Sequence, residues 1–298
     1  MSNKTTETSK AGFKQEIGLF GGVSMLGSIM IGGGIFYLGS YVLQRTDFSM
    51  GLSLLCWVIG GIITMLGGLC FAEMGAMLPK AGGMTVYLNT AFHPLVGFLN
   101  GFNSWLLSGA GSLAAGALAF SAIFGLTGTT GKLVASALMI AFTAYNMLGI
   151  KAGSMFQNFT MVAKLIPIAI IMISAFLMGD VSPDLAILPE GTSFDFSSFI
   201  RMTAFATLAT LWAYEGWINL NTVSEEMKNP KRNLPLSLII AIGGITLLYV
   251  LFNYAIYRVI PADEVRSLID SESFYLGTEV AKRLLGGFGG VIVIIGMT

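Results

Sequence analysis

Long apolar runs separated by short polar joins make up most of this chain. Each run is long enough to cross a hydrocarbon core of ~30 Å, which takes ~20 helical residues. An open strand would leave unpaired backbone groups in lipid, so we expect every run to be a helix. The predicted spans are 17–43, 51–77, 93–124, 132–150, 157–179, 199–223 and 234–260, with an eighth that begins near residue 280 and is cut off at Thr298.

The composition is that of a membrane protein. Hydrophobic residues make up 54% of the chain and charged residues 11%, with a mean hydropathy of +0.77, outside the usual range for a soluble domain. The net charge is zero, so the sequence gives no sign of a basic surface that would bind nucleic acid. Cys56 and Cys70 share one predicted helix ~21 Å apart, too far for a disulfide. With a single histidine in the chain, we expect no metal and no other cofactor.

The basic residues predict which end of the chain faces the cytoplasm. With the N-terminus inside, the inner segments hold eight Lys and Arg residues and the outer segments hold seven. The inner ones lie in short joins beside helix ends, which carry the most weight in the positive-inside rule. We therefore expect a cytoplasmic tail over 1–16 and a transmembrane region of about seven and a half spans over 17–298 in the plasma membrane.

Gly32, Gly33 and Gly34 lie near the middle of the first predicted span. Three glycines cost a helix ~1 kcal/mol each relative to alanine. If the helix opens here, N–H groups at the start of its second half face outward, and this positive end of the helix dipole suits a carboxylate. The alternative is a close helix crossing of the GxxxG type.

A second interruption is predicted at Trp212-Ala213-Tyr214-Glu215-Gly216-Trp217. Glu215 lies ~15 Å from the inner end of its span, and an acid at such a depth costs ~2.5–3.5 kcal/mol unless it faces a cavity or a partner. Glu215 is expected to contact a substrate ammonium, carry a proton, or pair with an internal lysine. The alternative is a purely structural kink in which neighbouring backbone groups hydrogen-bond to the carboxylate. Two interrupted helices in corresponding halves of a membrane chain are typical of a transporter substrate site.

Lys164 is the one basic residue inside a predicted span, ~10 Å from the inner end. Its side chain either reaches the inner surface along the lipid or remains inside the protein. Inside, the ammonium would take the place of a Na⁺ beside the first interruption or pair with Glu215. The sequence leaves these alternatives open.

Aromatic and small residues give two further expectations. Trp212, Tyr214 and Trp217 flank Glu215 and form either a gate that contacts cations or ordinary core anchors. Glycines and alanines crowd residues 109–119 of the third span, a pattern that lets backbones approach closely. We expect this span deep in a helical bundle.

Taken together, these motifs resemble the amino acid–polyamine–organocation superfamily, in particular its L-type amino acid transporter branch. The first motif is Gly32-Gly33-Gly34-Ile35-Phe36, and the second is Leu78-Pro79-Lys80-Ala81-Gly82-Gly83. The most specific stretch begins at Trp212 and continues through Glu225-Glu226-Met227-Lys228-Asn229-Pro230-Lys231-Arg232-Asn233-Leu234-Pro235. The resemblance covers essentially the whole chain after the tail.

The resemblance implies an all-α, LeuT-like inverted-repeat bundle with discontinuous helices 1 and 6 and alternating access. The amides of Gly33 and Gly34, beside Gly32, would hold a substrate carboxylate. Trp212 would close over the bound amino acid as the gate. Lys164 matches a lysine that stands in for sodium, which implies Na⁺-independent exchange or proton coupling. The carbonyls expected near the amino group are those of Met30, Trp212, Ala213 and Glu215.

Two departures from the family pattern bear on function. Gly33 replaces a serine, so a hydroxyl contact to the carboxylate is missing while the amide remains. The family has more spans than this chain, whose fold is truncated in helix 8. We expect a secondary active amino acid permease, an exchanger of neutral or cationic L-amino acids, and not an enzyme. The alternatives are a proton-coupled symporter and a non-transporting membrane fragment or partner protein.

Overall fold

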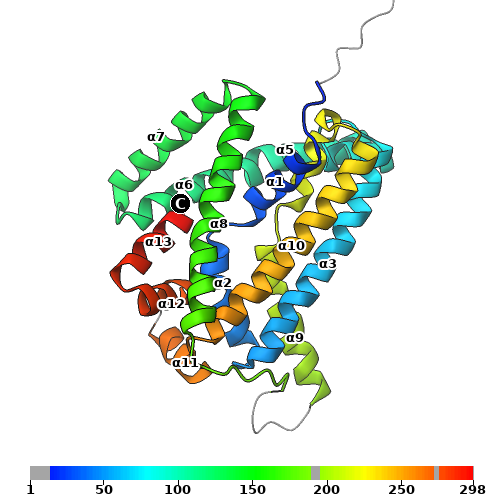
Figure 1. Cartoon of the computed structure of the whole chain (residues 1–298). Coiled ribbons are helices and arrows are strands. Elements are labelled where there is room, and N and C mark those ends of the chain that lie inside the picture. The colour runs from blue at the N-terminus through cyan, green and yellow to red at the C-terminus, as the bar shows by residue number, and fades with distance from the viewer. Residues whose placement is uncertain (1–13, 189–194, 272–274, 298) are drawn as a thin grey trace, which may run out of the picture.

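The computed structural model describes residues 14–188, 195–271 and 275–297, and this part of the chain is all-helical (Figure 1). Most of the expected tail 1–16 lies outside the described residues, which begin at Lys14. An isolated bridge between Ile17 and Met227 is the one β-type pairing in the described part. The fold class predicted from the apolar runs is therefore confirmed at the level of a helical membrane protein.

The predicted spans are present as helices, several of them in pieces. In chain order they are α1 (Leu19–Met30) with α2 (Gly34–Arg45), α3 (Met50–Met77), α5 (Pro94–Asn103) with the π-helical η1 (Ser104–Gly109) and α6 (Ala110–Ile123), α7 (Gly128–Asn146), α8 (Ile150–Met178), α9 (Phe196–Ala213) with the 3-10 helix η2 (Trp217–Glu226), and α10 (Pro230–Tyr257).

The polar joins and the last predicted run contain further short helices. They are α4 (Met84–Ala91), α11 (Ala262–Asp270), α12 (Leu276–Leu285) and α13 (Gly287–Met297). The run expected near residue 280 is thus two pieces, separated by Gly286 at a φ of 61°. Helix α7 starts at Gly128 and ends at Asn146, so the fourth span begins and ends about four residues earlier than the predicted 132–150.

Four stretches of the described chain are long and apolar enough to cross a membrane, or five if the bent pair α1–α2 counts as one span. They are α3, the α5–α6 segment, most of α8, and α10. Helices α7 and α9, both predicted as spans, are not among them. In the case of α9 the predicted run 199–223 ends early, because the chain leaves the α-helix after Ala213.

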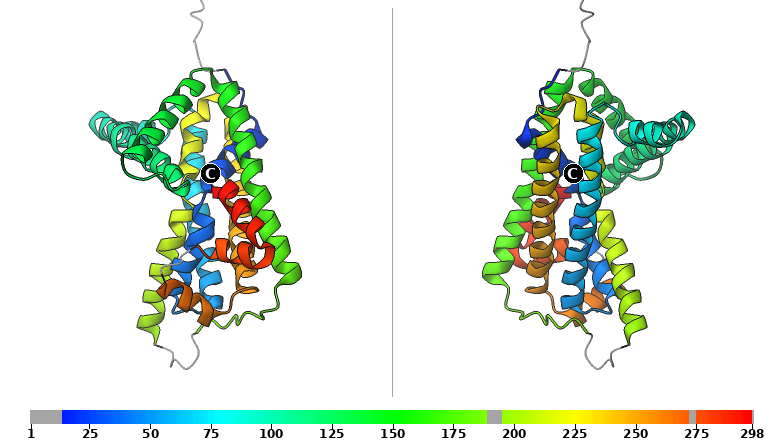
Figure 2. Two further views of the ribbon diagram at one scale, coloured as in Figure 1. Left: turned by 90° about the vertical axis from the view of Figure 1, so that its left-hand side faces the viewer. Right: turned by 90° about the vertical axis from the view of Figure 1, so that its right-hand side faces the viewer.

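Helices α3 and α10 lie side by side as an antiparallel pair on the right-hand side of the bundle in Figure 1, and both face the viewer in the right view of Figure 2. Gly61, Gly68 and Gly75 recur every seven residues on the face of α3 that meets α10. A Cβ atom on Gly61 would lie 2.3 Å from Thr246 Oγ1, and one on Gly75 would lie 2.3 Å from Leu234 Cδ2. The absence of side chains at these glycines lets the two backbones approach closely.

The joins gather at two opposite ends of the bundle. At one end, the N–H of Lys228 donates to the Ile17 carbonyl at 2.8 Å, and the N–H of Ala81 donates to Glu225 Oε2 at 3.0 Å. At the other end, the Arg258 guanidinium donates to the Gly179 carbonyl at 2.6 Å. The joins predicted to share the inner side thus lie at one end of the bundle, and those predicted to share the outer side lie at the other end.

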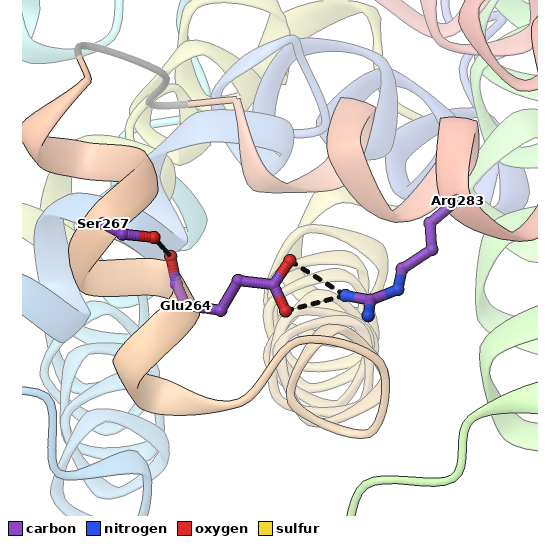
Figure 3. A network of polar contacts seen from close by, with 3 residues as sticks. All are labelled: Glu264, Ser267 and Arg283. Carbon is purple, nitrogen blue, oxygen red and sulfur yellow. Dashed lines mark hydrogen bonds and ion pairs between the residues drawn. The ribbon is translucent and has the colours of Figure 1, made fainter.

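Polar contacts order the second of these ends. The Asp195 carboxylate accepts the Ser198 N–H at 2.9 Å and caps α9, and its hydrogen bonds with Ser198 hold the pKa of Asp195 below its usual range. Figure 3 shows Arg283 Nη1 of α12 at 3.0 and 2.8 Å from the two carboxylate oxygens of Glu264 on α11. Both of these side chains are exposed, so the pair fixes geometry more than it adds stability.

The third span does not lie deep in the bundle. Only 6% of the most apolar window of the α5–α6 segment is buried, and part of this segment projects from the side of the bundle in Figure 2. The expectation drawn from its glycines and alanines is therefore wrong for the described chain. Helix α6 packs mainly against α7 and η1, so most of its small residues face outward.

We predict that Gly61→Val lowers the stability of the folded protein by about 1–3 kcal/mol, because the added methyl groups overpack the α3–α10 contact. The measurement is the melting temperature of the detergent-purified protein, followed by size-exclusion chromatography. Gly244→Val is the matched control on α10, since a Cβ at Gly244 meets no atom within 4 Å. Equal melting temperatures for the two variants would contradict the close packing.

Candidate functional site

The first span is broken at the predicted glycines. Helix α1 ends at Met30, α2 begins at Gly34, and the two axes differ by 59°. The carbonyls of Gly32 and Gly33 accept the N–H groups of Ile35 and Phe36 and so start α2. No described residue provides a backbone acceptor for the N–H groups of Gly32 and Gly33. These donors lie at the positive end of α2, where an anion is stabilised.

The second span is broken between Ala213 and Trp217. Helix α9 ends at Ala213, and Gly216 has a φ of 111°, a conformation that side chains disfavour. The chain then continues as the 3-10 helix η2. A Cβ atom on Gly216 would lie 2.4 Å from Ile29 Cγ2 on α1. Gly216 therefore allows the second break to pack directly against the first.

Tyr249 of α10 joins the two breaks through hydrogen bonds. Its hydroxyl oxygen lies 2.7 Å from the Met30 carbonyl and 3.0 Å from the Ala213 carbonyl, and the side chain is 1% exposed. These carbonyls lie at the C-terminal ends of α1 and α9, where the helix dipole is negative and a cation is stabilised. The two breaks thus present donors for an anion close to acceptors for a cation.

The three aromatic residues around Glu215 have different surroundings. Tyr214 is fully buried and donates to the Trp57 carbonyl at 2.9 Å. Trp217 packs edge-on against Phe71 of α3 with ring centroids 5.2 Å apart. Trp212 is 66% exposed and lines a hollow of about 420 Å³ between α2 and α9. Of the three, only Trp212 is an exposed side chain, whereas Trp217 is half-buried.

Glu215 and Lys164 are not paired with each other or with any other ion in the described chain. The Glu215 side chain is exposed, whereas Lys164 is partly buried on α8. Of the carbonyls expected near a substrate amino group, that of Trp212 already accepts the Glu215 N–H at 3.3 Å. The direct pair between Glu215 and Lys164 that the sequence left open is therefore absent from this structure.

Helix α8 contacts α1 within one turn of Lys164. Ser24 is hydrogen-bonded to Asn158, and a Cβ atom on Gly27 would lie 2.8 Å from Met161 Cε. The Ser28 hydroxyl donates to the Gln157 carbonyl at 3.0 Å. Lys164 follows Met161 on α8 by three residues, about one helical turn beyond these contacts.

One cavity of the described chain is lined by none of the residues that form the two breaks. It has a volume of about 650 Å³, lies between α6, α7 and α8, and meets α1 only at Ser28. None of the predicted site residues lines it, so the candidate site rests on the broken helices instead. No group of three or more His, Cys, Asp or Glu side chains in the described part of the chain is placed to hold a metal ion.

The apolar helices and their joins at two opposite ends define a multi-pass membrane protein. The chain belongs to a family of amino acid permeases, because the family model described as "Amino acid permease" matches residues 17–298. The resemblance drawn from the sequence motifs is thereby confirmed.

Curated relatives agree with this family. The chain is 34% identical over 279 residues to the mouse protein "b(0,+)-type amino acid transporter 1", covering 89% of this chain and 55% of the relative. It is 31% identical over 294 residues to "Serine/threonine exchanger SteT" of Bacillus subtilis (strain 168), covering 97% and 64%. It is 29% identical over 294 residues to the "Cystine/glutamate transporter" of Pongo abelii, covering 94% and 56%.

The chain thus spans between 55% and 64% of the length of these three relatives. All three are named as transporters or exchangers, and none as an enzyme. The expectation that this chain is not an enzyme is confirmed by this family relationship.

We predict that Gly216→Ala destabilises the protein by more than about 1–2 kcal/mol, the cost of a left-handed conformation for a residue with a Cβ atom. The clash with Ile29 adds to this cost. Melting temperature in detergent is the measurement. In the double variant Ile29→Ala/Gly216→Ala the clash is removed and the conformational cost remains, so partial recovery is expected. Full recovery would contradict the need for glycine, and an unchanged single variant would contradict the contact.

Proposed function

We propose that this chain carries the substrate site of a secondary active amino acid transporter that works by alternating access. The family and the names of the relatives support an amino acid as the substrate. The observation that carries the proposal is the meeting of two broken helices at Met30, Ala213 and Tyr249. A free amino acid needs donors for its carboxylate and acceptors for its ammonium, and this pair of breaks offers both.

The substrate carboxylate binds at the start of α2, on the amides of Gly33 and Gly34. Gly32 leaves this approach open, since a Cβ there would meet no atom within 4 Å. The ammonium binds at the ends of the preceding half-helices, with the Met30 and Ala213 carbonyls as acceptors. Each charged group thus lies at the end of a helix dipole that stabilises it.

Trp212 closes over the bound amino acid. Its side chain is exposed beside the break and borders the hollow between α2 and α9. A large amphipathic ring at this place covers the substrate and excludes water when it turns inward. The carbonyls of Trp212 and Glu215 complete the polar wall of the site in the occupied state.

Lys164 takes the place of a sodium ion, and the cycle is Na⁺-independent exchange. The support is its position on α8 about one turn beyond the contacts with α1, together with its partial burial. A fixed ammonium there offers a positive charge to the exposed carbonyls without a bound cation. Proton-coupled symport is the alternative that keeps the same site, with Lys164 or Glu215 as the group that carries the proton.

Glu215 selects the charge of the substrate side chain. It has no cationic partner within 4 Å in the described chain, so its carboxylate is available to a substrate. An arginine or lysine side chain would supply a charge-assisted partner. We therefore favour cationic amino acids over neutral ones, which would fit better if Lys164 neutralised Glu215.

The whole assembly is proposed to follow the inverted-repeat architecture of a LeuT-like bundle, with α1–α2 and α9–η2 as the equivalent broken helices. The end that contains Ile17, Ala81 and Lys228 is proposed to face the cytoplasm, in the plasma membrane. This orientation follows from basic residues in short joins at that end.

We predict that proteoliposomes containing the purified protein take up labelled amino acid faster when they are preloaded with unlabelled amino acid. Exchange couples entry to exit, so empty vesicles should be slow. Replacing Na⁺ by choline should leave the rate unchanged. Equal uptake into empty and preloaded vesicles would contradict exchange, uptake driven by an inward proton gradient would favour symport, and no uptake at all would favour the non-transporting alternative.

We predict that Glu215→Gln raises the KM for arginine and lysine by about tenfold or more and leaves the KM for neutral amino acids unchanged, because a charge-assisted hydrogen bond is worth ~1.5–3 kcal/mol. Uptake kinetics in proteoliposomes are the measurement. Glu226→Gln, at the far end of η2, is the matched control. The same KM for cationic substrates in both variants would reject the role of Glu215.

A further inference from the structure

Tyr249 is a buried polar residue in a helix that the sequence presents as an ordinary apolar span. It lies between Trp57 and Tyr214, with ring centroids 5.2 Å from each, so the aromatic ring is held from two sides. Among the side-chain hydrogen bonds of the described chain, those of its hydroxyl alone reach both breaks. Packing alone explains the ring and does not explain the hydroxyl.

The hydroxyl has one proton and two carbonyl neighbours. The 2.7 Å distance to the Met30 oxygen matches the most common length for an O–H···O hydrogen bond, whereas the Ala213 oxygen lies at 3.0 Å. A tyrosine hydroxyl donates one hydrogen bond at a time and can also accept one. When the Tyr249 hydroxyl donates to the Met30 carbonyl, the Ala213 carbonyl receives no hydrogen bond from Tyr249.

We propose that Tyr249 is a positioning residue for the substrate ammonium group, an inference that rests on the function proposed above. Its hydroxyl ties the end of α1 to the end of α9 and keeps the Met30 and Ala213 carbonyls converging on one point. The Ala213 carbonyl then accepts an N–H from the ammonium, and the hydroxyl oxygen has a lone pair for a second one. Tyr249 therefore determines recognition of the amino group and not of the carboxylate.

Removing the hydroxyl has a defined consequence. In Tyr249→Phe two carbonyl oxygens of like partial charge face each other without a proton between them, so they are expected to separate and the ammonium site widens. The amides of Gly33 and Gly34 belong to the other end of the substrate and keep their geometry. The loss should therefore depend on whether the ligand has an amino group.

The experiment compares two ligands on two variants. Binding of the preferred amino acid and of its desamino analogue, which keeps the carboxylate and side chain, is measured by thermal shift and calorimetry on the purified protein. We expect Tyr249→Phe to weaken the amino acid by about tenfold and the desamino analogue by less than about twofold. Tyr257→Phe is the matched control, because Tyr257 is also buried on α10 and its hydroxyl contacts Ser53, at 2.7 Å, away from both breaks.

Each other outcome overturns the inference in a recognisable way. Equal weakening of both ligands means that Tyr249 only supports the fold, and unchanged or tighter binding of the amino acid means that the hydroxyl does not shape the ammonium site. If the wild-type protein binds neither ligand, the proposed function fails as well. Should Tyr249→Phe not fold, 3-fluorotyrosine at position 249 keeps the ring and strengthens the donor, and it must change the affinity ratio of the two ligands.

Discussion

Backbone polar groups inside a membrane protein must find partners, and this constraint shapes the centre of the molecule. Helices α1 and α9 stop where they meet inside the bundle and leave N–H and C=O groups without their usual helical partners. Lipid cannot satisfy these groups. The Tyr249 hydroxyl lies within hydrogen-bond distance of the Met30 and Ala213 carbonyls and donates to one of them at a time. The two breaks meet at Gly216, and the amides of Gly32 and Gly33 have no backbone partner in the described chain. These remaining donors and acceptors are the groups proposed to bind a zwitterion.

The tight α3–α10 pair is the scaffold that makes this arrangement possible. Glycines on α3 let α10 approach, and α10 presents Tyr249 to both breaks. Trp57 and Tyr214 then pack on Tyr249 and bury its ring. The opposite wall, with Trp212, is exposed. A buried wall opposite an exposed one fits the alternating access proposed above.

The sequence predicted the helices and both interruptions, because apolar length and consecutive glycines are local properties. It did not predict the exposure of the third span or the different surroundings of Trp212 and Trp217, because small and aromatic residues serve several kinds of packing. Tyr249 was missed for a related reason. One tyrosine in an apolar run gives no local signal, and its role arises only when α1, α9 and α10 come together.

The most direct test of the central claim is an experimental structure of the protein with a bound amino acid. The account predicts the substrate between the two breaks, with its carboxylate on the amides of Gly33 and Gly34 and its ammonium within hydrogen-bond distance of the Ala213 carbonyl. Substrate bound in the cavity between α6, α7 and α8, with both breaks empty, would contradict it.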